Sequence, residues 1–362
     1  MTHDVNHDRD LWKRVPLSGA ALWKKRLFGS HLDTVLTVLL AALLTWALWF
    51  FAKWGLWSAT FVGHTQSDCN SEGACWVFIK ERFLQFMVGF WPEDLLWRPV
   101  AFALITGSCV ASLVITHRMV TWLLCAVLIP LSAWLILWGA PLGLTPVETS
   151  QWGGFLLTIL ISIVGIIFSL PVGIALALGR RSSSRIFRYA ATTFIELWRG
   201  VPLITVLFMA SVMFPLLLPR SMDVDKLVRA LFGITLFSSA YMAEVVRSGL
   251  QMIPKGQEEA ATALGLGRWQ TRALIILPQA LRISVPGIVN TFIGLIKDTS
   301  LILIIGMFDL LGMIQAASTH PDWLGSAVEG YVFGGLCFFL LCWALSRWSR
   351  SLEINATSRG TP

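Results

Sequence analysis

The stretch Glu258–Leu281, "EEAATALGLGRWQTRALIILPQAL", lies between two segments that are apolar enough to enter a lipid bilayer. It opens with strong helix formers, and its glutamates stand in the first turn, where the helix dipole favours negative charge. Gly265 and Gly267 then allow a turn with positive φ. A second amphipathic stretch, Trp269–Leu277, ends at Pro278, which cannot donate a hydrogen bond inside a helix. We therefore expect a helix, a glycine turn, a second helix and a break, held in water between two membrane helices.

The composition is that of an integral membrane protein. Of 362 residues, 56% are hydrophobic and 14% are charged, and the mean hydropathy is +0.69. The 18 tryptophans against 3 tyrosines fit a chain that places indole rings at the lipid headgroups. The net charge of +7 does not indicate nucleic-acid binding, because the Lys and Arg residues cluster between apolar spans rather than on one basic face.

Apolar runs of about 18 or more residues, enough to cross roughly 30 Å of hydrocarbon, predict an all-α polytopic bundle of about eight membrane helices. The spans are expected near Thr34–Ala52, Pro99–Thr116, Val120–Ala140, Gly153–Gly179, Val201–Leu218, Val228–Ala243, Ile283–Phe308 and Val328–Trp348. The turn-rich break "APLGLTPVETSQW" separates the first three spans from the rest. We expect a basic tail over residues 1–33, a three-helix module with a long outer loop over residues 34–148, a transmembrane domain over residues 149–352 and a second tail over residues 353–362.

Lysine and arginine are concentrated in the N-terminal tail and in every second loop, which predicts that both termini and the opening stretch are cytoplasmic. The first span has a basic flank but no clean cleavage site, so we expect an uncleaved anchor. Cys69 and Cys75 share the outer loop "DCNSEGAC", and either a small disulfide or two reduced thiols is compatible with that spacing.

The opening stretch resembles the EAA motif of ABC-importer permeases at full spacing. The matching residues are Glu259, Ala260, Ala261, Gly265, Ile275, Leu277 and Pro278, within a loop at residues 253–278. In that family the loop forms a coupling helix that docks into the ATPase subunit, and the resemblance implies the same role here. On physical grounds alone, an interfacial or re-entrant connector explains the stretch as well.

Further segments resemble the polar amino-acid branch of that family over about Trp152–Leu352. They are "ELWRGVPLITVLF", "AYMAEVVRSGLQMIPKGQ", "LPQALRISVP" and "LIKDTSL", with Ser248 where the branch often has Gly. The extra spans resemble the longer permease subunit of the general L-amino-acid importers of Gram-negative bacteria, which implies the bacterial inner membrane. The resemblance implies four partners: an ATPase dimer, a second homologous permease, a periplasmic amino-acid-binding protein and an L-amino-acid substrate. The chain has no Gly-Lys pair, so it holds no Walker A loop, and ATP and Mg²⁺ are expected on the ATPase.

Ionisable residues inside the expected spans mark a candidate substrate path. Lys297 and Asp298 are costly in hydrocarbon, by on the order of 3 kcal/mol each, so they should face protein or a water-filled cavity. Thr299 and Ser300 could bond backbone groups freed by a break in the helix. An amino acid offers both counter-charges, its ammonium for Asp298 or Glu244 and its carboxylate for Lys297. The alternative is a structural ion-pair network, and for Glu244 the expected structural partner is Arg247.

No metal-ligand spacing emerges from the six histidines, and no nucleophile elbow or catalytic triad is visible, so no enzyme chemistry is expected. The main alternative function is an ion- or proton-coupled secondary transporter that uses Lys297, Asp298 and Glu244 as relay groups. A receptor or scaffold without transport activity is a third. Substrate identity and the role of the extra spans do not follow from the sequence.

Overall fold

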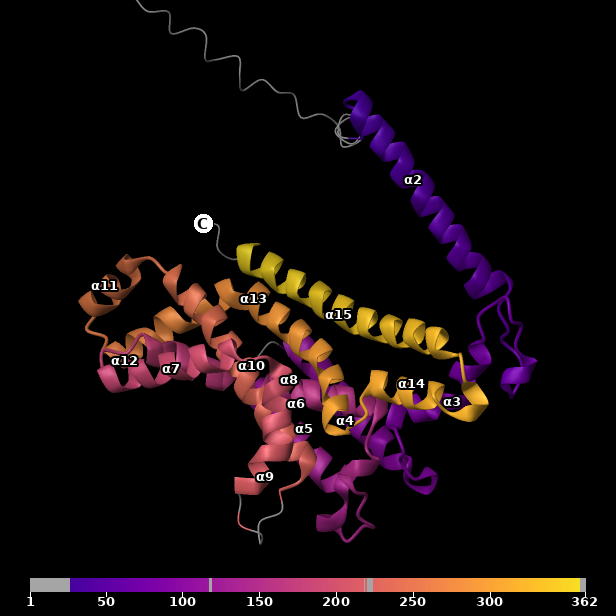
Figure 1. Ribbon diagram of the computed structural model, residues 1–362. Coiled ribbons are helices and arrows are strands. Elements are labelled where there is room, and N and C mark those ends of the chain that lie inside the picture. The colour runs from indigo at the N-terminus through magenta and orange to yellow at the C-terminus, as the bar shows by residue number, and fades with distance from the viewer. Residues whose placement is uncertain (1–26, 117–118, 218, 220–223, 359–362) are drawn as a thin grey trace, which may run out of the picture. The chain divides into compact units, whose positions relative to one another are not determined.

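The computed structural model describes residues 27–116, 119–217, 219 and 224–358, and these are almost entirely helical (Figure 1). The chain divides into two compact units, with the boundary between Val77 and Phe78. The predictions for the N-terminal tail up to residue 26 lie outside the described residues. The functional division expected at residues 148–149 stays a prediction.

Unit 1 is built around one long apolar helix. Helix α2 (His31–Ala52) begins at the side-chain cap of Ser30 and runs into a π-helical turn at Lys53–Trp57, and none of the residues of α2 is buried. The loop that follows is closed by a disulfide between Cys69 and Cys75. Ahead of that disulfide, Asp68 accepts the backbone N–H groups of His64 and Thr65, each at 2.9 Å. These bonds favour the carboxylate and lower the pKa of Asp68.

Unit 2 contains the rest of the chain. Its helices are α3 (Trp76–Val88, which begins at the end of unit 1), α4 (Trp97–Thr116), α5 (Met119–Ser132), α6 (Gly154–Arg180), α7 (Arg185–Gly200), α8 (Leu203–Phe208), α9 (Phe214–Leu217), α10 (Lys226–Gln251), α11 (Lys255–Ala263), α12 (Arg268–Gln270), α13 (Leu277–Asp298), α14 (Leu310–Ser318) and α15 (Ala327–Ser358). π-Helical segments extend α5 over Ala133–Trp138, join α8 to α9 over Met209–Met213 and join α12 to α13 over Thr271–Ile276.

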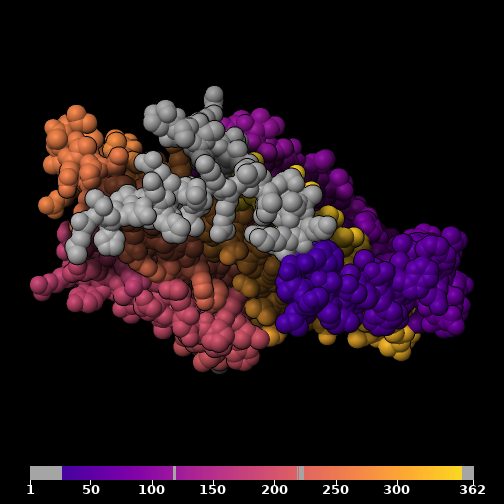
Figure 2. Space-filling view, turned by 90° about the horizontal axis from the view of Figure 1, so that it is seen from above, coloured from indigo at the N-terminus to yellow at the C-terminus, as the bar shows by residue number. Residues whose placement is uncertain are grey.

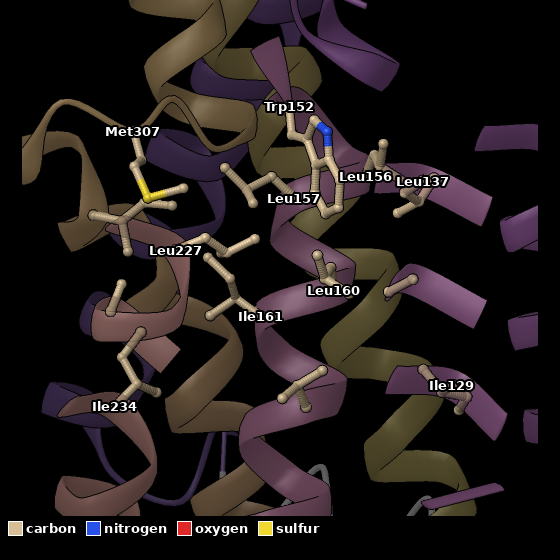
Figure 3. Close-up of a cluster of buried hydrophobic side chains, with 14 of the residues drawn as sticks. Ile129, Leu137, Trp152, Leu156, Leu157, Leu160, Ile161, Leu227, Ile234 and Met307 are labelled. Carbon is tan, nitrogen blue, oxygen red and sulfur yellow. The ribbon is translucent and has the colours of Figure 1, made fainter. Parts of the chain in front are cut away.

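Helix α6 is the centre of unit 2, because it is apolar on nearly every side and packs mainly against α10, with α7, α13 and α14 around it. Its buried residues Leu157, Leu160 and Ile161 meet Leu227 and Ile234 of α10 (Figure 3). A helix that is hydrophobic all round must be buried in protein or lie in a membrane.

The crossing of α10 and α13 depends on a residue without a side chain. A Cβ placed on Gly249 would lie 2.0 Å from the Oγ of Ser284 and 2.6 Å from the carbonyl oxygen of Ala280. Only glycine permits two helix backbones to approach this closely.

Six helical segments in the described chain are long and apolar enough to cross a membrane, or up to seven if one bent pair is counted, compared with the expected number of about eight. The expected fifth span proves to be half of that pair: Arg185–Gly200 and Leu203–Leu217 meet at 101°, where Pro202 prevents a continuous helix. The expected sixth span lies within α10, which carries charges such as Glu244 and Arg247 and is not among those six segments.

Candidate functional site

Helix α11 contains the first part of the predicted coupling motif, Glu259–Ala261, and ends in a Schellman turn. The N–H of Leu266 donates to the carbonyl of Ala261 at 3.1 Å, and that of Gly265 donates to the carbonyl of Thr262 at 2.9 Å. Gly265 has a φ of +76°, a conformation that L-residues adopt only at a cost, while the space around its α-carbon is open. The backbone therefore requires glycine here. Gly267 does not share this role, because it has a φ of −68° and caps α12, so the expectation of positive φ there was wrong.

The α11 part of the coupling motif is almost wholly exposed. Within it only Ala261 is buried, with 3% of its surface accessible, whereas Glu259 and Ala260 face solvent. Farther along the motif, Ile275 is partly buried and packs against the core around Ile276. Four large apolar side chains around α11 are also exposed, and we call them the coupling face: Met252, Leu264 (81% accessible), Trp269 (77%) and Leu274. In Figure 2 the orange segment that includes α11 projects from one end of unit 2. Exposed apolar clusters rimmed by charge are typical of protein–protein contacts.

A small recess beside α11 places Glu259 next to basic groups. It has a volume of about 220 Å³ and includes Arg181, Lys255 and Glu259 in its walls. The guanidinium of Arg181 donates to the carbonyl of Leu250 at 2.8 Å, which ties the loop after α6 to the end of α10. On the other side, Gln279 donates to the side chain of Gln257 at 3.2 Å. The segment is thus fixed to the bundle at its edges while its face is open.

Pro278 does not break the helix as predicted. The helical run continues from Arg268 to Ile305, and Ile275, Leu277 and Pro278 lie within it. The π-helical turn at Thr271–Ile276 ends directly before Leu277, and its wider hydrogen-bond spacing accommodates the missing N–H of Pro278. The motif therefore ends at a change of helical pitch instead of a chain break.

Glu244 lies at the centre of a cluster of arginines from three helices. Its carboxylate oxygens are 2.5 Å from Arg180 of α6, 2.8 Å from Arg247 of its own helix and 3.8 Å from Arg199 of α7. Arg180 also pairs with Glu196 of α7 at 2.9 Å. The single carboxylate is bound by several guanidinium groups, an arrangement that joins α6, α7 and α10 and leaves little capacity for a substrate ammonium.

Lys297 and Asp298 lie near the C-terminal end of their helical run. The α-helix changes to a 3₁₀-helix (Thr299–Ile305) directly after Asp298. Thr299 and Ser300 donate to the carbonyls of Ile296 and Lys297, each at 2.8 Å, which are the backbone contacts that sequence reasoning anticipated. Lys297 is exposed and Asp298 is half-buried, and within the described residues neither forms an ion pair with Glu244.

Neither Arg180 nor Arg199 was predicted as a partner of Glu244. Both contact Glu244 from helices that are 45 or more positions away in the sequence, so no local spacing marks them. The amphipathic pattern of Arg185–Gly200, with its charges on one face, could have predicted a separate helix there.

Comparison with known proteins identifies the family of the chain. Residues 169–353 match the family described as "Binding-protein-dependent transport system inner membrane component". The chain is 49% identical to the inner membrane amino-acid ABC transporter permease protein YhdY of Escherichia coli, over 95% of each chain. It is 37% identical to the glutamate/glutamine/aspartate/asparagine transport system permease protein BztC of Rhodobacter capsulatus, over 92% of this chain and 93% of that one. The crystal structure of an amino acid ABC transporter with histidines has the same fold over 56% of this chain and 92% of its own, with a TM-score of 0.50 and 24% identity.

The residues that carry the EAA spacing lie inside the matched region, in an exposed segment between long apolar helices. The relatives match the extra N-terminal spans as well. The chain belongs to the family of inner-membrane components of binding-protein-dependent transport systems.

Proposed function

We propose that this protein is the permease subunit of an ATP-driven importer of polar or general L-amino acids. The observation that carries the proposal is the coupling segment: an exposed EAA helix closed by a positive-φ glycine and surrounded by the coupling face. The names of the relatives with 49% and 37% identity support amino acids as the substrate class. The partners are an ABC ATPase dimer, which binds ATP and Mg²⁺, a second permease and a periplasmic binding protein.

The coupling step follows from the way α11 is held. Because the Schellman turn fixes the direction of the chain after Ala263, a displacement of α11 by the ATPase moves the helix that starts at Arg268 rather than bending the loop. The exposed Leu264 and Trp269 supply apolar contact area for the ATPase, and Glu259 supplies a charge at its edge. In this orientation α11 and both termini are cytoplasmic, in agreement with the distribution of Lys and Arg.

Within the membrane, we propose that Asp298 lies on the substrate path and that Glu244 has a structural role, joining helices through its ion pairs. Asp298 is half-buried with no ion pair among the described residues, whereas Glu244 is surrounded by guanidinium groups. An unpaired carboxylate near the end of a span can hold a substrate ammonium during passage, with Lys297 one residue away for a carboxylate. Asp298→Asn should leave the complex assembled and reduce uptake; unchanged uptake would remove Asp298 from the path.

The coupling proposal is tested at Gly265, in the turn after α11, with Gly256 inside α11 as its control. Gly265→Val places a β-branched residue at φ +76°, at a cost of at least about 1–2 kcal/mol, whereas Gly265→Asn tolerates that conformation better. Gly256 also has open space around its α-carbon but no positive φ. We expect Gly265→Val to lose ATPase co-purification and uptake, Gly265→Asn to retain part of both and Gly256→Ala to retain both.

Permease abundance in the membrane is measured alongside, so that loss of the protein is not mistaken for loss of coupling. If Gly265→Val, combined with Glu259→Gln, still binds the ATPase and supports ATP-dependent uptake, the coupling segment has been wrongly assigned. Uptake that responds to an ion gradient and not to ATP would refute the proposed function as a whole.

A further inference from the structure

A second pocket lies at the N-terminal end of α10, at the opposite end of that helix from α11. We call it the α10 pocket. Its volume is about 310 Å³, and its principal walls are Trp138, Glu148, Trp152, Asp225, Lys226 and Met307. A cavity of this size holds one small metabolite, and its walls combine charged groups of both signs with aromatic surface.

The two carboxylates of the α10 pocket differ in how they are held. Asp225 is fixed as the N-cap of α10: one oxygen accepts the N–H of Leu227 at 2.8 Å, and the other accepts the hydroxyl of Thr149 at 2.5 Å. Glu148 is exposed, and its Oε2 accepts the hydroxyl of Ser150 at 3.2 Å. Glu148 therefore has capacity for a cationic group, while Asp225 adds negative potential and rigidity.

Lys226 lies at the start of α10 and over the end of the 3₁₀-helix Thr299–Ile305. It is the first residue of α10, where the helix dipole disfavours a positive charge. No carboxylate lies within ion-pair distance of it in the described part of the chain. Its ammonium reaches over Gly306, where a Cβ would come within 3.8 Å of the Nζ atom. The charge is thus held over the end of the 3₁₀-helix and open to an anion.

The apolar part of the α10 pocket is preformed. Trp152 and Met307 are each 5% accessible, and the indole N–H of Trp152 donates to the carbonyl of Val147 at 3.2 Å. Trp138 is 39% accessible and presents ring surface to the cavity. Trp138, Glu148 and Trp152 all come from the segment that precedes residue 169, where the match to the family begins.

We propose that the α10 pocket is a binding site for a free amino acid, built by the N-terminal part of the chain onto the permease domain. The ligand's ammonium pairs with Glu148, its carboxylate pairs with Lys226, and its side chain packs against Trp138. Because the pocket carries two carboxylates and one ammonium, it favours neutral and basic amino acids over acidic ones. The choice of an amino acid as ligand rests on the proposed function, and the positive-inside orientation places the site on the outer side.

The test is equilibrium binding of radiolabelled L-glutamine and L-glutamate to the purified full complex without nucleotide or binding protein. We expect glutamine to bind more tightly than glutamate. Lys226→Met and Glu148→Gln should each weaken glutamine binding by at least about tenfold, or about 1.4 kcal/mol. Matched controls are Lys80→Met and Glu93→Gln, which neutralise exposed charges outside the pocket and should leave binding unchanged. Lys226→Met should not lower the apparent Tm, because it removes an unfavourable charge from a helix start.

ATP hydrolysis stimulated by the binding protein is measured on the same samples. A wild-type complex that responds to the binding protein but binds no free amino acid would overturn the α10 pocket and leave the proposed function intact. If Lys226→Met and Glu148→Gln weaken that stimulation but not amino-acid binding, the pocket is a docking surface for the binding protein and the proposal is also overturned. Amino-acid binding that is lost in both variants supports the site, whatever the rate of ATP hydrolysis.

Discussion

Replacing Gly249 with alanine tests whether the close crossing of α10 and α13 holds unit 2 together. The new Cβ would lie 2.0 Å from the Oγ of Ser284 and 2.6 Å from the carbonyl oxygen of Ala280, both closer than real Cβ atoms approach other groups. The hydroxyl can rotate, but the carbonyl belongs to a helix backbone, so the helices must separate. Overpacking of this kind destabilises by about 1–3 kcal/mol.

Gly294→Ala is the matched control, because Gly294 also lies in a long helix and has no heavy atom within 4 Å of the site of a new Cβ. Both substitutions gain the same helix propensity, about 0.5–1 kcal/mol, so the difference between them measures the crossing alone. Thermal unfolding in detergent should place Gly249→Ala several degrees below Gly294→Ala, given about 2–4 °C per kcal/mol. Ser284→Ala should restore only part of the difference, since the Ala280 carbonyl remains. Equal unfolding temperatures would refute the reasoning.

Two further substitutions probe buried charge. Glu244→Gln removes the carboxylate that pairs with Arg247 and leaves Arg180 with Glu196 alone, so it should lower stability by on the order of 2 kcal/mol. Glu258→Gln, on the exposed face of α11, should not change the unfolding temperature, and equal losses in the two variants would contradict a structural role for Glu244. Burial raises the pKa of Asp309, which caps α14, to about 6. The native protein therefore binds more protons than the unfolded chain between about pH 4 and 6, so stability should decline as the pH rises through that window. Asp309→Asn should flatten this part of the stability curve, and parallel curves for the two proteins would exclude the carboxyl as its source.

Hydropathy predicted the membrane helices because the signal is local to each of them. The spans at α2, α4, α6 and α15 were expected within a few residues of where they lie, since long apolar runs need no information from distant parts of the chain. The bend between α7 and α8 was not predicted, because it depends on contacts with distant parts of the chain. Its helices are short or mixed in polarity, and what joins them into one bent unit is their packing on α6 and α10.

The candidate sites also differ in whether their residues are close together or far apart in the sequence. The helix and glycine turn at Glu258–Gly265 were predictable because the helix formers and Gly265 lie within a few consecutive residues, whereas their coupling role stays a prediction. Arg247, three residues after Glu244, was predicted as its partner, and the structure confirms that pair. Arg180, Arg199 and the walls of the α10 pocket could not be predicted, because they come from segments that are far apart in the sequence. At Pro278 the expectation that proline ends a helix was wrong. The π-helical turn before it accommodates the N–H group that proline lacks.

The uninterrupted helical run from Arg268 to Ile305 has a consequence for communication across the membrane. Its 38 residues span roughly 55 Å along the axis, from the turn after α11 to Gly306 at the edge of the α10 pocket. If ATPase docking changed the affinity of the α10 pocket for its ligand through this helical run, ligand binding would change the affinity for the ATPase by the same factor, because thermodynamic coupling is reciprocal.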